Sequence, residues 1–193
     1  MRRTNASPTQ QEAAILKAAA EEVALVGVGR LSMEVIARQA GVSRSTLYRR
    51  FPSRDALITE LGRQTFDFAM ARLQTVAIDS GPAEAAVAAF REGVRLLTGE
   101  PVMRRFLQLD GDFTATAGML DEARVFLVSA STAMAKALRS AGATMSDSDL
   151  LAVAELHIRL AASLVQVSSP VLDVTDDNAV AAYARTHLAP LVR

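Results

Sequence analysis

The sequence predicts an all-α protein built from a small N-terminal head and a larger helical body. Apolar residues recur at helical spacing in successive segments, and glycine or proline punctuates the chain between them. Charge is divided unevenly: residues 1–54 contain nine Arg/Lys and four Asp/Glu, whereas the other 139 contain twelve and seventeen. A basic end joined to an acidic remainder is expected when only one end meets a polyanion. We therefore predict a head of residues 1–54 and a body of residues 55–193.

The overall composition narrows the class of protein. Half of the 193 residues are apolar, which is ample for a core, and cysteine is absent. No disulfide framework or thiol chemistry is expected. No apolar run approaches the roughly 18 residues of a membrane span. Arg2 and Arg3 precede a segment interrupted by Gln10, Glu12 and Lys17, which argues against a signal peptide. We expect a soluble cytoplasmic protein that does not contact a membrane.

The N-terminal segment is predicted to be an arm followed by a helix. Residues 1–8 lack an apolar pattern and are either a disordered tail or a basic arm that reaches into a DNA minor groove. From Thr9 to Val26 the apolar spacing is helical, and Gly27 and Gly29 end the helix. This helix is expected to be the third member of the head.

The next stretch, residues 31–51, reads as two short helices joined by a tight turn. Ser32 and Ser43 stand where N-caps are expected, and Gly41 supplies the positive φ of a sharp turn. Small Ala37 and apolar Leu47 are spaced so that the second helix crosses closely over the first. This is the spacing of a helix-turn-helix motif over about residues 32–51, in which the second helix enters a DNA major groove.

The second helix also has a basic outer face. Arginine binds a guanine edge through two hydrogen bonds and also neutralises phosphate. The alternative is an ordinary solvated face of a helical hairpin. If the face binds DNA, the base-reading candidates are Arg44, Ser45 and Arg49, and the phosphate-positioning candidates are Thr46, Tyr48, Arg50, Arg54 and Ser32 with its helix N-terminus.

This segment, IARQAGVSRSTLYRRFPSRDALI, closely resembles the DNA-binding segment of the TetR family of bacterial transcription factors. The residues that match the family's motif are Ile36-Ala37, Ala40-Gly41-Val42-Ser43, Thr46-Leu47-Tyr48 and Phe51. Arg50 stands where the family usually has His or Tyr, and Ser53-Arg54 replaces Ser-Lys; both departures keep or add positive charge. The resemblance covers about the first third of the chain. It implies a dimer that binds a palindromic operator and is released when a small molecule changes the spacing of the two heads.

The body is predicted to consist of helices separated by Gly- and Pro-containing breaks. The first joins head and body, and Gly62 within it is expected to permit a bend. The predicted helices span residues 54–79, 82–97, 102–110, 119–141, 146–168 and 177–191, with a loop at 111–118.

The last two predicted helices are the expected dimer contact. The helix of residues 146–168 is apolar around almost its whole circumference, so it must be buried on two sides. The helix of residues 177–191 is apolar along one side. Two such helices from each of two chains would form a four-helix homodimer interface, as the resemblance implies. The alternative is an ordinary core helix in a monomer.

The body offers no pattern typical of catalysis. His157 and His187 lie among apolar neighbours without a carboxylate or second histidine three or four residues away, so both are predicted to be packed interface residues rather than metal ligands. Asp110 and Asp112 form a loop pair that is usually solvated. No cofactor, metal site or enzyme activity is expected.

An apolar effector pocket is expected among helices 54–168, with no ligand residue assigned. Arg104, Arg105 and Gln108 would orient an acidic or polar effector if they do not simply face water. Aromatic side chains that either line the pocket or form plain core are Phe66, Phe68, Phe90, Phe106, Phe113 and Phe126.

The sequence therefore favours a dimeric DNA-binding transcriptional repressor with an unidentified small-molecule effector. Two other functions stay open. One is an activator, or a regulator without an effector, of the same fold. The other is a small-molecule-binding or sequestering protein whose head no longer reads DNA.

Overall fold

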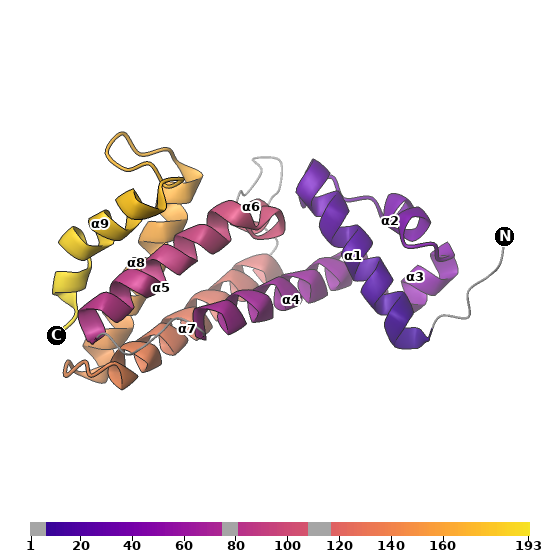
Figure 1. Cartoon of the computed structure of the whole chain (residues 1–193). Coiled ribbons are helices and arrows are strands. Elements are labelled where there is room, and N and C mark those ends of the chain that lie inside the picture. The colour runs from indigo at the N-terminus through magenta and orange to yellow at the C-terminus, as the bar shows by residue number, and fades with distance from the viewer. Residues whose placement is uncertain (1–6, 75–80, 108–116) are drawn as a thin grey trace.

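The computed structural model describes residues 7–74, 81–107 and 117–193, which are helical with no strand among them. The head contains α1 (Pro8–Val26), α2 (Met33–Gln39) and α3 (Arg44–Arg50), and α4 (Arg54–Gln74) extends from it into the body. Figure 1 shows the head at one end of an elongated molecule and the chain's C-terminus at the far end of the body. The predicted all-α fold is confirmed.

The first helix begins one residue earlier than predicted. Ser7 and Gln10 form a reciprocal capping box: the Gln10 backbone N–H donates to Ser7 Oγ at 3.2 Å, and the Ser7 N–H donates to Gln10 Oε1 at 2.8 Å. Pro8 occupies the first helical position, where its fixed φ suits the helix and its missing N–H costs nothing. Residues 1–6 of the predicted arm lie outside the described residues.

The turn between α2 and α3 has the predicted geometry. Ser32 Oγ accepts a hydrogen bond from the Val35 N–H (3.4 Å), and Ser43 Oγ accepts one from the Thr46 N–H (3.1 Å). Gly41 has a φ of +67°. The N–H of the residue after it donates to the carbonyl of Ala37 at 3.0 Å, which closes a Schellman motif. Short helices with well-satisfied ends therefore hold α3 at a defined angle to α2.

One apolar cluster fixes the head, and it extends into α4. Leu47 is the only fully buried residue of the short helix α3, and it packs with residues of α1 and α2. Leu57 and Leu61, on the first turns of α4, belong to the same cluster. Further along α4, Ala69 belongs to the cluster of the body. The linking helix is therefore anchored at both ends.

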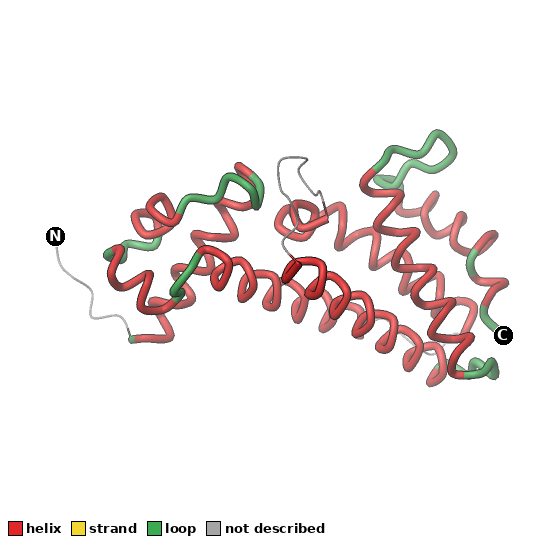
Figure 2. Tube along the Cα trace, turned by 180° about the vertical axis from the view of Figure 1, so that it is seen from behind, coloured by secondary structure: helices red, strands yellow, loops and turns green. Residues whose placement is uncertain are grey.

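The body is a bundle of helices that continues from α4. It comprises α5 (Pro82–Gly99), α6 (Pro101–Leu107), α7 (Ala117–Ser140), α8 (Asp147–Gln166), α9 (Asp177–His187) and a 3-10 turn (Ala189–Leu191). Figures 1 and 2 show α7 lying along α4, with α8 packed against α7. Helix α5 contacts both α8 and α9. None of the described helices combines the length and apolarity needed to cross a membrane.

Several predicted boundaries in the body are corrected by the structure. The last helix ends at His187 and not at residue 191, because Pro190 lacks an N–H and disfavours helical backbone before it. The helix predicted from residue 119 begins at Ala117. Residues 75–79 and 108–110 of two other predicted helices, and 111–116 of the predicted loop, lie outside the described residues.

Gly62 lies inside continuous α4, where it faces another element. A Cβ built at this glycine would lie 3.7 Å from the ring of Phe106 on α6, which is ordinary contact. Gly62 therefore lies where α6 packs against α4.

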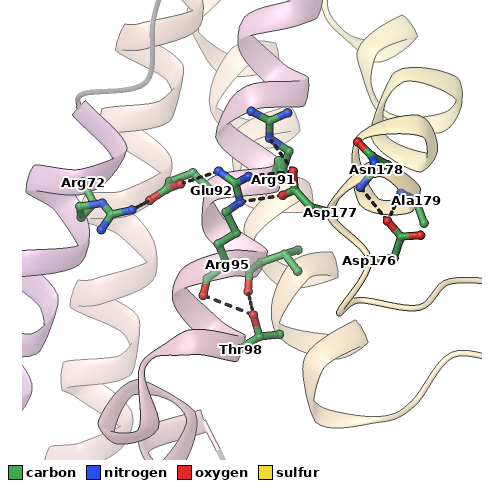
Figure 3. Close-up of polar contacts among 10 residues, drawn as sticks. Arg72, Arg91, Glu92, Arg95, Thr98, Asp176, Asp177, Asn178 and Ala179 are labelled. Atoms are coloured by element: carbon green, nitrogen blue, oxygen red, sulfur yellow. Dashed lines mark hydrogen bonds and ion pairs between the residues drawn. The ribbon is translucent and has the colours of Figure 1, made fainter.

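A row of ion pairs crosses α5 from α4 to α9 (Figure 3). Arg72 on α4 lies 2.6 Å from Glu92 on α5, and Arg95 lies 3.8 Å from Glu92 and 2.6 Å from Asp177 at the start of α9. The Glu92 side chain is only 11% exposed, so its charge is compensated by these arginines where water is scarce. The row ties α4 to α9.

The turn geometry predicts the effect of changing Gly41. Gly41→Ala should lower the free energy of unfolding by about 1–2 kcal/mol, since a Cβ is strained at positive φ while no atom lies within 4 Å of where that Cβ would be. Gly41→Asn should lose less, because asparagine tolerates this conformation. Denaturant unfolding of both variants measures the difference. An alanine variant as stable as the wild type would show that the turn does not need positive φ in solution.

Candidate nucleic-acid interface

The third helix presents one side to the head core and the other to solvent. Leu47 is 0% exposed, and Phe51 directly after the helix is 4% exposed. Arg44, Tyr48 and Arg49, which do not enter this core, are exposed. Because the buried side is fixed by packing, the direction of the outer side chains follows from the fold.

Four of the five predicted phosphate contacts are only half exposed, namely Ser32, Thr46, Arg50 and Arg54. Arg50 lies partly under the head surface, and its buried Nε has no hydrogen-bond partner among the described residues. Thr46 is also half-buried, and its Oγ1 lies 2.9 Å from Ser43 Oγ. Both residues therefore flank the outer face of α3.

Three hydroxyl groups at the start of α3 form hydrogen bonds that centre on Ser43 Oγ. Ser43 Oγ lies 2.9 Å from Ser45 Oγ, in addition to its contact with Thr46. The exposed Ser45 hydroxyl can turn to a new partner, since a hydroxyl both donates and accepts. Ser32 is half-buried and caps α2 in the same way.

One acidic group on this surface was not anticipated as a neighbour of the basic residues. The Glu34 carboxylate of α2 lies 3.9 Å from the Arg44 guanidinium of α3. The Glu34 side chain is 71% exposed and the Arg44 side chain 66% exposed. An exposed pair of this kind contributes at most about 1 kcal/mol. Arg44 can therefore leave it for a stronger anionic partner. The sequence did not predict this ion pair, because the two residues meet only where α2 and α3 cross.

Arg54 has an internal partner that sequence analysis did not foresee. Its guanidinium donates to the carbonyl of Val28 and, at 2.9 Å, to that of Gly29, in the connection between α1 and α2. These bonds fasten the start of α4 to the head. If Arg54 also contacts phosphate as predicted, its guanidinium must do so while it binds these two carbonyls.

The body contacts the head through α6 as well as through α4. Arg105 donates to the carbonyls of Ala24 and Leu25 at the end of α1, at 3.3 and 3.5 Å. Phe106 packs against the head cluster. Two of the three polar residues proposed to orient an effector are thereby placed: Arg105 faces the head and Arg104 is exposed, whereas Gln108 lies outside the described residues.

The two histidines have different surroundings. His157 is 1% exposed within a single chain, so the prediction that it is a packed interface residue is wrong: the core of the body covers it. Burial lowers the pKa of His157 from its ordinary value, although the hydrogen bond to the Val153 carbonyl acts in the opposite direction. His187 is exposed and its ring lies 4.7 Å from that of Tyr183.

The phenylalanines proposed for a pocket divide into several environments. Phe90 lines a small cavity of the body, Phe66 packs edge-on to Phe126 at 4.5 Å, and Phe68 is 45% exposed. Phe113 lies outside the described residues. In the part of the chain that the structure describes, no group of three or more His, Asp or Glu side chains is arranged to hold a metal ion.

Apolar side chains remain exposed on α8 in the single chain. Its buried stripe consists of Leu150, Ala154, His157 and Ala161. On other sides Leu151 and Leu156 are 41% and 48% exposed. These leucines leave α8 with an uncovered apolar surface.

Comparison with known proteins is consistent with this geometry. Residues 15–61 match the family described as bacterial regulatory proteins, tetR family. An uncharacterised helix-turn-helix transcriptional regulator of Mycobacterium tuberculosis is 29% identical over 174 residues, which covers 90% of this chain and 89% of the relative.

Solved structures show the same fold. GusR of Salmonella enterica superposes with a TM-score of 0.74 at 22% identity, covering 98% of this chain and 99% of that one. AibR, solved in complex with isovaleryl coenzyme A and operator DNA, superposes with a TM-score of 0.61 at 19% identity over 93% of this chain and 98% of its own.

The contacts of Arg54 predict a double effect of its removal. Arg54→Ala should lower the free energy of unfolding by roughly 1–3 kcal/mol, because the carbonyls of Val28 and Gly29 lose a charged donor. It should also weaken binding to every duplex and flatten the salt dependence by about one unit if the residue also meets phosphate. Chemical denaturation and binding titrations at several salt concentrations measure the two effects.

Arg63→Ala is the matched control, since it removes an exposed arginine that bonds to Glu60 and Asp67 on its own helix. Unchanged stability with Arg54→Ala would contradict the fastening role. An unchanged salt slope would remove Arg54 from the interface.

Proposed function

We propose that this chain is a DNA-binding transcriptional regulator of the TetR family, and specifically a dimeric repressor that a small-molecule effector releases from a palindromic operator. Residues 1–54 would form the reading head, and residues 55–193 would bind the effector and dimerise. The chain would act by binding alone, without catalysing a reaction.

The observation that carries the proposal is the orientation of α3. Leu47 anchors one side in the core, and Arg44, Tyr48 and Arg49 are exposed on the rest of the helix surface. A helix with a basic, exposed face at the edge of a helix-turn-helix motif can lie in the major groove of a duplex. Arginine then supplies both charge and a two-pronged donor for guanine.

The proposed roles follow the exposure of each side chain. Arg44, Ser45 and Arg49 are exposed and would read base edges. The residues that would meet phosphates lie at the margins of the face or at helix ends: Ser32, Thr46, Tyr48, Arg50 and Arg54. On binding, the Arg44 guanidinium would exchange the Glu34 carboxylate for DNA.

The uncovered surface of α8 supports dimerisation. Leu151 and Leu156 are large apolar side chains that a single chain leaves substantially in water. Burial of such a side chain contributes about 1.5–3 kcal/mol. Helices of about residues 146–168 and 177–191, the latter ending at His187 as α9, would pair with their copies around a twofold axis. A dimer of this symmetry suits a palindromic operator, because each head meets one half-site.

Two rigid links would carry an effector's influence from body to head. One is α4, which packs in both apolar clusters and is bound to the head by Arg54. The other is α6, whose Arg105 holds the end of α1. A ligand that displaced the body ends of these helices would change the distance between the two heads. AibR, which was solved with both a coenzyme A ester and operator DNA, is a related precedent for one chain that holds both.

The reading face predicts the effect of Arg49→Ala. Binding to a selected operator should weaken by about 1–3 kcal/mol, with relaxed preference at one base position, because a two-pronged guanine contact is lost. Gel-shift titrations with the operator and with its single-base variants measure this. Arg63→Ala removes the same charge from α4 and should leave base preference unchanged. Equal loss on operator and random DNA would make Arg49 a backbone contact.

The dimer proposal predicts that Leu156→Glu produces monomers. Wild-type protein should sediment at twice the 20.6 kDa of one chain, whereas a buried unpaired carboxylate should disrupt the interface. Leu25→Glu is the matched control, since Leu25 is a 73% exposed leucine on α1, remote from α8 in sequence and structure. Analytical ultracentrifugation separates the cases. A dimeric Leu156→Glu protein would place the interface elsewhere.

A further inference from the structure

A small cavity lies inside the body among four helices. Its volume is about 80 Å³, and it is bounded by α4, α5, α7 and α8. Methionine and small side chains form much of its wall, including Met70, Gly93, Ala130, Ala133 and Met134. His157 is the one polar side chain among the residues that line it.

The His157 ring has one nitrogen bound and one unbound. Its Nδ1 lies 2.7 Å from the Val153 carbonyl oxygen. A carbonyl oxygen can only accept, so Nδ1 carries the proton of the neutral ring. The other nitrogen, Nε2, is then an acceptor; it is buried and has no hydrogen-bond partner among the described residues. The ring also packs edge-on against Phe90, with centroids 6.2 Å apart.

We propose that this cavity binds a small uncharged molecule that donates one hydrogen bond, from a hydroxyl group, to Nε2 of His157. The inference rests on the proposed function, because it assigns a chemical class to the effector of that body. The rest of the molecule would be apolar, to match the methionine, alanine and phenylalanine side chains of the wall.

The surroundings of His157 select against charged ligands. A carboxylate would lose its hydration among apolar side chains and find no cation, because burial lowers the pKa of His157 and favours the neutral ring. A lone water would be held poorly as well: His157 offers it one polar side-chain partner, whereas buried waters typically have two to four. An alcohol or phenol satisfies Nε2 and fills the remaining space with apolar contact.

The size of the cavity sets how the ligand would enter. An engineered cavity of about 150 Å³ holds benzene, so a ring-sized ligand requires this cavity to widen. Met70 and Met134 are flexible, unbranched side chains that can turn aside. Met70 stands on α4, which is the helix that reaches the head. A ligand that fills the space would therefore press on an element that positions α3.

The test compares two ring molecules that differ in one group. Phenol and toluene are titrated by calorimetry into the full-length wild type and into His157→Leu, with no DNA present. We expect His157→Leu to weaken phenol binding by about tenfold or more, with toluene binding unchanged or tighter. The variant should fold, because it exchanges a buried unsatisfied acceptor for an apolar group.

Controls locate the effect at this nitrogen. His187→Gln changes the only other histidine of the chain and should leave both affinities unchanged. In a ¹⁵N imidazole spectrum, the Nε2 signal of His157 is the unprotonated-nitrogen signal that disappears in His157→Leu. Phenol should shift this signal in the wild type. An undiminished phenol affinity in His157→Leu, or a wild type that binds no phenol, would overturn the proposal. So would benzoate binding as tightly as phenol.

Operator titrations with and without phenol keep this inference separate from the proposed function. If phenol binds with the expected dependence on His157 and operator affinity does not change, the cavity assignment holds and effector release through it fails. If the variants show no dependence on His157 while another small molecule releases the operator, the ligand class is wrong and the repressor proposal stands.

Discussion

The structure depends on the long helix α4, which is packed into two apolar clusters. The first turns of α4 place Leu57 and Leu61 in the head core, and Ala69 lies in the core of the body. Because interiors are close-packed, a rigid element shared by two cores transmits displacement from one to the other. The Arg54 contacts at one end and the Arg72–Glu92 ion pair at the other add polar attachments that resist rotation of the helix. In the proposed mechanism, an effector in the body would act on α3 through this helix.

The same principle of fixed packing explains why the reading surface is well defined. Leu47 leaves α3 no freedom to turn, so the basic side chains occupy constant positions relative to the head. The exposed Glu34 beside Arg44 reduces the local positive charge in the free protein. If Arg44 reads a base as proposed, an acidic neighbour of this kind would penalise weak attachment to arbitrary phosphates and favour a duplex that offers Arg44 a better partner.

The body combines two unsatisfied features that a partner would complete. Leu151 and Leu156 on the outer sides of α8 are exposed in the single chain, and Nε2 of His157 has no hydrogen-bond partner among the described residues. Both lie on α8, one facing outward and the other inward. Dimerisation and ligand binding are therefore proposed to share one helix, and a change on its inner side would be felt at the contact between chains.

The sequence by itself determined the local features: the caps at Ser32 and Ser43, the positive φ of Gly41, and the buried Leu47 that points the basic residues outward. These depend on residues close together in the chain, so spacing and backbone preference were sufficient. It did not determine the Glu34–Arg44 pair, the attachment of Arg54 and Arg105 to α1 and its turn, or the inward position of His157. Each of these arises where separate helices pack together, and the packing angle of those helices decides which side chains meet.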